Sequence, residues 1–297
     1  MSDILSTLLP AREPRTLYHY TTQSGLIGII QKNEIWATHT QYLNDQREYI
    51  HALELVRRVL GDKRSQVTVK EDRAVLDEMI AAIGTDIQSI NVCVCSFSED
   101  GDSLSQWRAY GESTAGFAIG FSGEFLSTKA KEESAFLVPC VYEPDEQRII
   151  VERFVDIVLE EILMHRGDAQ LDDDFFWHRG GNLIPYLHRL APVIKDSSFR
   201  DEKEWRIITR PLMCSLERFN FRQGKSTIVP YYRFPLSKAV DESEPSSICE
   251  VVIGPTPNLS LSAMSVNSLL VSHKLVGHFV RGGSVSVKES KIPYRAW

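Results

Sequence analysis

The chain has 297 residues, with 43% hydrophobic and 25% charged side chains, which is ordinary for a globular protein. Its net charge of −7 at pH 7 disfavours indiscriminate binding to nucleic acid or to anionic membranes, although it allows a local basic groove. No apolar run approaches the ~20 residues that span a bilayer, and the first residues do not read as a signal peptide. We therefore expect a cytoplasmic protein with no membrane partner.

Strands and helices are predicted along the whole chain. Strands are expected at 17–21, 34–38, 90–98, 115–121, 136–142, 204–210, 227–236, 249–255 and 284–290. Helices are expected between Thr22 and Asn33, at 47–60 and 71–83, around Trp107, and at 145–165, 182–195 and 261–273. The two kinds of element follow one another irregularly, without a βαβα rhythm.

This order predicts an α+β fold in a single domain over residues 1–297. Because parallel sheets need regular crossovers, the sheets should be mainly antiparallel, with flanking helices. The helical stretch at about 145–195 is interpreted as an insertion on that sheet. Pro230 and Pro235 predict that their strand lies at a sheet edge, since proline cannot donate to a ladder.

The cysteines and histidines point away from disulfides and metals. The five cysteines are odd in number and have no repeated spacing, which predicts buried structural thiols in a reducing cytosol. Cys93 and Cys95 are two apart in an apolar run, so on a strand they share a buried face. The eight histidines do not combine with acids or thiols at metal-ligand spacings, and we expect no metal site.

Two strands carry polar residues that are candidates for a site. On the first strand, His19 shares a face with Leu17 and Thr21, while Tyr18 and Tyr20 face the other side. His19 can bind a ligand hydroxyl, act as a base, or be a satisfied core residue.

Ser96 and Ser98 lie on one face at the end of the strand at 90–98. Strand ends are where loops present functional groups, but the two serines also suit a turn.

A short helix and an acidic pair complete the candidates. Trp107, Arg108 and Tyr110 suit ligand contact, because arginine binds carboxylate or phosphate and aromatic rings stack on flat groups. The alternative for Arg108 is a structural ion pair. Glu202 and Glu204 are two apart, so on a strand both carboxylates share a face and repel, and one pKa should rise. This arrangement suits acid–base work or a solvated edge.

Several segments together resemble a bacterial family that is catalogued only as domain of unknown function 2971. They are LYHYT, YLND with Asn44 and Asp45, CSFSEDGDSLSQWRAYG, GFAIGF, EKEWR and the closing IPYR. The resemblance runs from about Leu17 to Arg295, and the family name implies no activity.

A second resemblance is to the ADP-ribosyltransferases, which carry histidine or arginine on a first strand, serine or tyrosine on a later one, and a catalytic glutamate on a third. Here the order is His19, then Ser96 and Ser98, then Glu202 and Glu204. His19 matches the histidine branch of these enzymes, whereas the serines and paired glutamates look more like the arginine branch. The resemblance implies an ADP-ribosyltransferase-like core with NAD as substrate and no metal.

The resemblance also implies roles for these residues. Glu204 would stabilise positive charge on the ribose, and Glu202 would orient or deprotonate an acceptor. His19 would hold the adenosine side and Arg108 the pyrophosphate. One serine would support Glu204, and aromatic side chains including Tyr18 and Phe97 would stack on nicotinamide. The implied NAD-binding set is His19, Tyr20, Thr21, Ser96, Ser98, Trp107, Arg108 and Tyr110.

The leading hypothesis is therefore transfer of ADP-ribose from NAD to a protein or nucleic acid, or NAD hydrolysis at the same site, in a stress or phage-defence setting. One alternative is a non-catalytic nucleotide- or protein-binding module of the same fold. Another is a hydrolase or nuclease that uses His19 and the two glutamates. The leading hypothesis predicts that His19, Ser96 or Ser98, Arg108 and Glu204 line one cleft, and that Glu204→Gln leaves the fold nearly intact.

Overall fold

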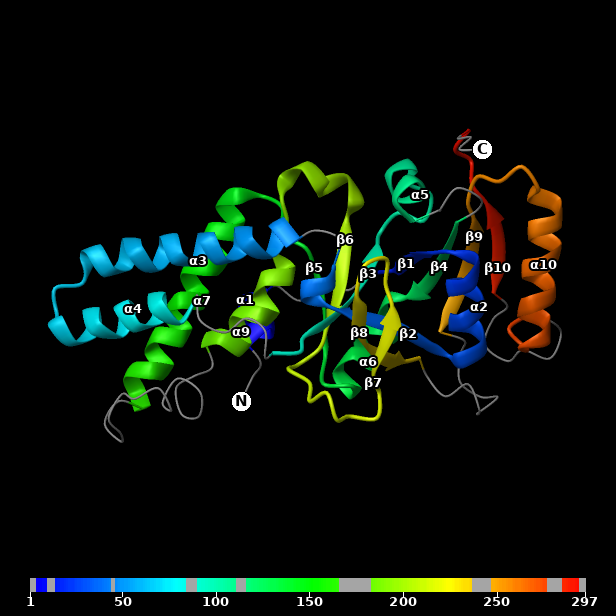
Figure 1. Cartoon of the computed structure of the whole chain (residues 1–297). Helices are drawn as coiled ribbons and strands as arrows, with labels where there is room; N and C mark the ends of the chain where they lie inside the picture. Colours follow the sequence, from blue (N-terminus) through cyan, green and yellow to red (C-terminus); the bar gives the residue numbers. More distant parts are fainter. Residues whose placement is uncertain are drawn as a thin grey trace.

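The computed structural model describes residues 4–9, 14–43, 46–83, 90–110, 116–165, 183–236, 247–276 and 285–293. Figure 1 shows a twisted sheet beside a lobe of helices. In these described ranges, no helix has the length and apolar character needed to cross a bilayer. Asn44 and Asp45 of the YLND segment lie outside the described residues.

The helices and strands have the following bounds. The α-helices are α1 (Ile4–Leu8), α2 (Gln23–Lys32), α3 (Gln46–Gln66), α4 (Lys70–Ala82), α5 (Leu104–Tyr110), α6 (Gly123–Glu132), α7 (Pro144–His165), α9 (Leu183–Leu190) and α10 (Leu259–Ser272). Short 3-10 helices are η1 (Thr40–Tyr42), η3 (Ala191–Val193) and η4 (Ser197–Glu202). The strands are β1 (Thr16–Thr21), β2 (Glu34–His39), β3 (Cys93–Ser98), β4 (Phe117–Ser122), β5 (Phe136–Pro139), β6 (Glu204–Ile208), β7 (Phe219–Gln223), β8 (Ile228–Pro235), β9 (Ile248–Ile253) and β10 (Ser286–Glu289).

The strands form one mixed sheet that is mainly antiparallel, as predicted. Its main path runs β10-β9-β4-β1-β3-β2-β8-β7, and β6 joins β3 to β5. Of the paired strands that are described, β9 and β10 run parallel and the other pairs are antiparallel. This arrangement confirms the predicted mixture of helices with a mainly antiparallel sheet.

Strand β3 is the junction of the sheet. One of its edges pairs with β6 over the whole length of β6. On the other edge, β1 pairs with β3 through Tyr18 and Ser98, and β2 pairs with β3 through Thr38 and His39. The β1 and β2 branches therefore leave the same edge of β3 at its two ends.

Local sequence explains α2, the helix that joins β1 to β2. The Thr22 side chain accepts a hydrogen bond from the Gly25 amide at 3.2 Å, which caps the first turn. Asn33 ends the helix in the left-handed conformation at φ 52°, which asparagine tolerates better than most residues. Leu26, Ile29 and Ile30 lie at helical spacing and are buried against the sheet.

Two hydrophobic cores lie on opposite faces of the sheet. The sheet core packs β1, β3, β4, β6 and β9 against α2, α6 and α10. The lobe core packs α1, α3, α4, α7 and α9 together and against the lobe-facing ends of β3 and β6. The predicted insertion at 145–195 is thus one part of the lobe, and N-terminal helices supply the rest; residues 166–182 are outside the described ranges.

The prediction that Pro230 and Pro235 mark an edge strand is wrong, because β8 lies between β2 and β7. Each proline nevertheless sits where β8 has a neighbour on one side. Pro230 pairs with Phe221 of β7, beyond the β2 ladder, and Pro235 pairs with Glu34 of β2, beyond the β7 ladder. The proline rule therefore holds for each position and fails for the strand as a whole.

Short or atypical segments were not predicted, namely α1, α6 and β7. The prediction of five buried cysteines is also partly wrong. Cys93, Cys95 and Cys140 are buried, whereas Cys214 and Cys249 are exposed, and all five are free thiols. The difference in burial follows from position in the fold, since the Cys93 and Cys95 side chains point into the sheet core.

Thiol labelling under native conditions should separate these two classes. Burial raises the pKa of the Cys93 thiol to about 12 and also raises that of Cys95, so both should react only after unfolding. Cys214 and Cys249 should react first with a maleimide, as mass spectrometry of tryptic peptides would report. Rapid native labelling of Cys93 and Cys95 would contradict the packing of β3.

Candidate functional site

The site forms where three neighbouring strands present polar side chains on the same face. Tyr18 of β1 is paired with Ser98 of β3, and Ser98 is paired with Glu204 of β6. Directly paired residues point to the same side of a sheet, so these three side chains share a face. Arg206 and Ser96 form the next pair on that face.

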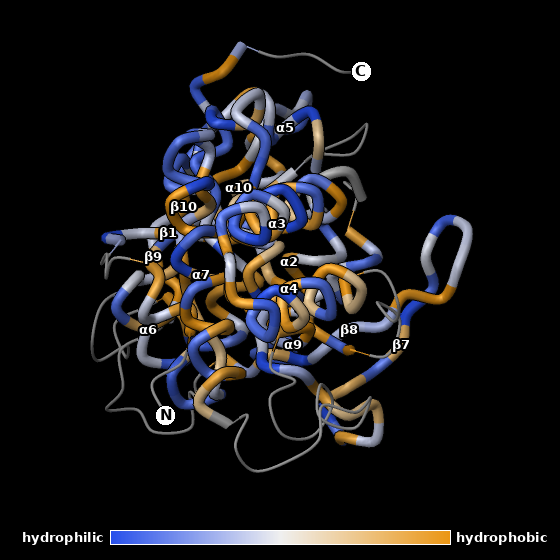
Figure 2. Tube along the Cα trace, turned by 90° about the vertical axis from the view of Figure 1, so that its left-hand side faces the viewer, coloured by the Kyte–Doolittle hydropathy of each residue, from blue (hydrophilic) through white to orange (hydrophobic). Residues whose placement is uncertain are grey.

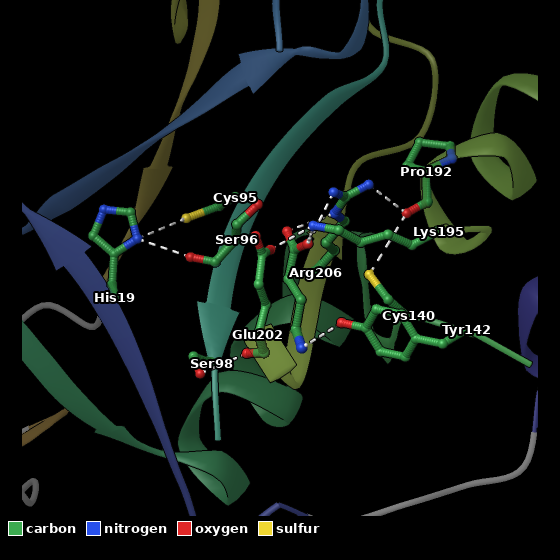
Figure 3. Close-up of polar contacts among 11 residues, drawn as sticks. His19, Cys95, Ser96, Ser98, Cys140, Tyr142, Pro192, Lys195, Glu202 and Arg206 are labelled. Carbon is green, nitrogen blue, oxygen red and sulfur yellow. Dashed lines mark hydrogen bonds and ion pairs between the residues drawn. The ribbon is translucent and has the colours of Figure 1, made fainter. Parts of the chain in front are cut away.

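A buried ionic cluster occupies the β6 end of this face (Figure 3). The Lys195 ammonium lies 2.5 Å from one Glu204 oxygen and 2.6 Å from one Glu202 oxygen. The Arg206 guanidinium grips the same Glu204 carboxylate through Nε at 2.7 Å and Nη2 at 3.0 Å. The side chains of Lys195, Glu204 and Arg206 are 5–7% exposed, whereas that of Glu202 is 24% exposed. We call these four residues the ionic cluster.

Backbone contacts hold the ionic cluster in place. The Tyr142 hydroxyl accepts a hydrogen bond from the Glu204 amide at 2.9 Å. The Ser98 hydroxyl donates to the Glu202 carbonyl at 2.7 Å, and Arg206 Nη1 donates to the Pro192 carbonyl at 2.7 Å. Lys203 adopts the left-handed conformation at φ 44°, which turns the chain between η4 and β6 and brings both glutamates to Lys195.

Glu204 is an ionised carboxylate. Burial alone would raise its pKa, but the positive charges and hydrogen bonds of Arg206 and Lys195 lower it to about 2. The prediction that mutual repulsion of the acids raises a pKa is therefore wrong for Glu204. The two carboxylates do not repel each other directly, because the Lys195 ammonium lies between them.

The structure does not bring His19 to the ionic cluster. As predicted, His19 lies on the face of β1 opposite Tyr18, and its ring packs against Phe97 at 5.8 Å between centroids. Phe97 belongs to the sheet core and points away from Ser98 and Glu204. The prediction that His19 and Glu204 line one cleft is thus wrong, because register puts them on opposite faces.

His19 instead fills the region where β1 and β3 diverge. Its Nδ1 lies 2.9 Å from the Ser96 carbonyl oxygen, which can only accept, so Nδ1 carries a proton. Burial lowers the pKa of His19, although the Ser96 contact opposes this, so the ring is neutral at pH 7 with Nε2 as an acceptor.

The other aromatic candidates divide into structural and accessible groups. Tyr20 and Trp107 are buried edge to face at 4.7 Å in a small cluster between β1 and α5. The Tyr20 hydroxyl donates to the Asp100 carbonyl at 2.7 Å and accepts from the Ser103 amide at 2.9 Å. These contacts position the loop before α5 and leave neither ring open to stack on a ligand.

Tyr110 lies near the ionic cluster and is 41% exposed. Partial burial and the nearby carboxylates of Glu204 and Glu202 raise the pKa of its phenol. Its helix, α5, packs against η4, which ends at Glu202. Tyr110 is therefore an accessible aromatic side chain beside the acidic pair.

The remaining candidates lie around this centre. Ser96 is half-buried and Ser98 is buried, and Ser98 also accepts a hydrogen bond from the Asp100 amide at 3.1 Å. Arg108 is exposed on α5, outside the ionic cluster. Thr21 shares the His19 face and lies against α2, where its hydroxyl approaches Gly25.

Sequence reasoning missed Lys195 and Tyr142. Lys195 lies two residues after the 3-10 helix η3, and its neighbours have no charge pattern that marks it. In the ranges that the structure describes, no group of three His, Cys, Asp or Glu residues is placed to hold a metal ion.

Comparisons with known proteins give one family match and two solved structures. A family model described as protein of unknown function (DUF2971) matches residues 106–207, from α5 to β6, which confirms the resemblance over that part of the chain. A structure of Thermus sp. 2.9 DarT in complex with ADP-ribosylated ssDNA is 13% identical, with 93% of this chain and 95% of that chain covered and a TM-score of 0.33. A structure of Thermus sp. 2.9 DarT in complex with NAD+ is 12% identical, with 94% of this chain and 98% of that chain covered and a TM-score of 0.34. No curated protein matches the chain. These TM-scores are too low to define the fold.

Glu204→Gln should destabilise the protein, contrary to the expectation from sequence. The substitution leaves Lys195 and Arg206 buried with a single carboxylate, and breaking a buried pair costs about 3–5 kcal/mol. The pKa of Glu204 is lowered by folding, so its stabilisation is fully present above its unfolded pKa of about 4.3. It disappears as the pH falls through the folded value of about 2. Urea unfolding of both proteins from neutral to acid pH measures this.

Glu132→Gln is the matched control, because Glu132 forms an exposed pair with Lys129 at 2.9 Å. Exposed pairs contribute about 0–1 kcal/mol, so this variant should unfold almost as wild type. Equal stability of the two variants at neutral pH would show that Glu204 does not hold the buried cations.

Proposed function

We propose that this protein cleaves the nicotinamide–ribose bond of NAD at the ionic cluster, and passes ADP-ribose to an acceptor or to water. The observation that supports this most is a pair of carboxylates on one short segment, held by Lys195 and Arg206 beside Ser98 and the β1 strand. The adjacent strands β6, β3 and β1 carry Glu204, the two serines and the first-strand residues on which the resemblance to the ADP-ribosyltransferases rests.

The chemistry needs negative charge that is in place before the reaction. The bond between ribose C1′ and the nicotinamide nitrogen breaks, and its electron pair leaves with nicotinamide. Positive charge develops on the ribose in the transition state. A fixed carboxylate therefore stabilises the transition state more than it stabilises the ground state. An acceptor hydroxyl, amine or water then attacks C1′ and loses its proton to a base or to solvent. The acceptor class, protein or nucleic acid, stays a prediction.

Exposure divides the roles of the two glutamates. Both Glu204 oxygens accept hydrogen bonds from Arg206 or Lys195, and the side chain is 7% exposed. Glu202 has 24% exposure and shares Lys195 through one oxygen. We assign contact with the ribose to Glu202 and the positioning of Lys195 to Glu204. Tyr110, beside this pair, is the candidate to stack on nicotinamide.

One observation favours a non-catalytic nucleotide- or protein-binding module. Lys195, Glu204 and Arg206 satisfy one another inside the protein, which is what a purely structural ion cluster does. Such a module would bind a ligand on this face without turning it over. Nicotinamide release distinguishes the two functions, because binding alone leaves NAD intact.

Glu202→Gln should abolish most NAD turnover while the fold survives. The side chain is partly exposed, so loss of its charge affects Lys195 less than the Glu204 change does. Removing a charge that acts in the transition state lowers the rate roughly a hundredfold or more. Nicotinamide release measured by chromatography, with calorimetry for NAD binding, gives the rate and the affinity separately.

The control is Glu143→Gln, since Glu143 is 60% exposed and pairs with Arg200 at 3.4 Å. It should turn NAD over as wild type does. Wild-type protein that neither binds NAD nor releases nicotinamide, with protein and nucleic-acid acceptors present, would overturn the proposed function. Binding without release would support the non-catalytic module.

A further inference from the structure

An exposed tryptophan lies among basic side chains on the outer face of β2, β8 and β7. Trp36 is 39% exposed and is paired with Arg233 of β8. The Lys32 ammonium lies 5.6 Å from the centroid of its ring, and the Arg222 guanidinium 6.0 Å. We call these four residues the Trp36 platform. Figure 2 shows the β7–β8 hairpin standing out from the rest of the molecule, and Arg222 lies on this hairpin.

Several contacts hold Trp36 in one orientation. Tyr231 packs against its ring at 4.5 Å between centroids, and the indole Nε1 donates to a Glu34 oxygen at 3.1 Å. Arg222 is also fixed, because its Nη2 donates to the Thr38 hydroxyl at 3.0 Å. A large aromatic ring that is both rigid and exposed has lost its conformational entropy before a ligand arrives, which favours binding.

The charges around the ring are suited to an anion. Lys32 and Arg222 are exposed, and neither forms an ion pair with a carboxylate among the described residues. The Arg233 guanidinium forms an ion pair with Glu34 at 4.0 Å and donates a hydrogen bond to the Glu217 carbonyl at 2.9 Å. Glu34 is the acidic group that faces the ring. The surface around the Trp36 ring is therefore locally basic, although the whole chain has a net charge of −7.

We propose that the Trp36 platform binds single-stranded nucleic acid. A base would stack on the exposed part of the Trp36 ring, and backbone phosphates would meet Lys32 and Arg222. Single strands are recognised by this combination, because every base has a flat face and every linkage a negative charge. A duplex stacks its bases inside the helix and presents only its phosphates, so a duplex should bind more weakly.

The platform lies on the same face of the sheet as the ionic cluster. Thr38, two residues after Trp36, is paired with Val94 of β3, and Val94 shares its strand face with Ser98. Ser98 is paired with Glu204. Val94 is buried in the lobe core, and binding at Trp36 does not depend on NAD chemistry.

Fluorescence anisotropy tests the proposal with labelled oligothymidine and oligouridine of about 15 nucleotides, and with a duplex of the same length. Wild type should bind both single strands more tightly than the duplex. Trp36→Ala should raise the dissociation constant about tenfold or more, because stacking on an aromatic side chain is lost. Arg222→Gln should weaken binding and lower the salt dependence by about 0.7 in the log–log slope. A preference between the two oligonucleotides assigns DNA or RNA.

Two substitutions serve as controls. Phe221 is 60% exposed on the opposite face of the same hairpin, and Arg148 is exposed on α7. Phe221→Ala and Arg148→Gln should bind as wild type does, and circular dichroism should show all four variants folded. The proposal is overturned if wild type binds no oligonucleotide, if duplex binds as tightly as single strands, or if Trp36→Ala and Phe221→Ala behave alike. Self-association that Trp36→Ala abolishes, without oligonucleotide binding, would assign the surface to a second copy of the chain.

Discussion

The ammonium of Lys195 lies between two carboxylates, and this contact joins the helical lobe to the sheet. The Lys195 amide donates to the Val141 carbonyl at 3.1 Å, and its own carbonyl accepts from Gln147 of α7 at 2.7 Å. Its side chain meets Glu202 and Glu204 at the start of β6. One residue thus connects α7, the segment after β5 and the acidic pair, so the orientation of the carboxylates depends on how the lobe packs.

The electrostatics of this cluster explain why an ionised acid can be buried. Two carboxylates and two cations sum to zero, and their close contacts offset the cost of removing each from water. The balance depends most on the buried groups Lys195, Glu204 and Arg206, because a single unpaired charge in the interior is unfavourable. The same burial that threatens stability also strengthens the field of the carboxylates, since fewer water molecules screen them. An arrangement with a stabilising role therefore also suits a reaction that develops positive charge.

Patterns within one segment were predictable, whereas contacts between segments were not. The faces of β1, the cap of α2 and the burial of Cys93 and Cys95 follow from local rules of alternation, capping and hydrophobicity. The relation of His19 to Glu204 depends on the register between strands, which no single strand encodes, and one residue of shift changes the face. Lys195 reaches the acidic pair from another segment, and its neighbours in sequence carry no sign of that contact.

We propose that Glu202 faces a bound NAD molecule while Glu204 stays locked in the ionic cluster. The most direct measurement is a crystal structure of the protein with an NAD analogue whose glycosidic bond does not break. We expect a ribose hydroxyl within hydrogen-bonding distance of Glu202, nicotinamide against Tyr110, and Glu204 still paired with Arg206. An analogue bound away from Glu202, or on the His19 face of the sheet, would contradict it.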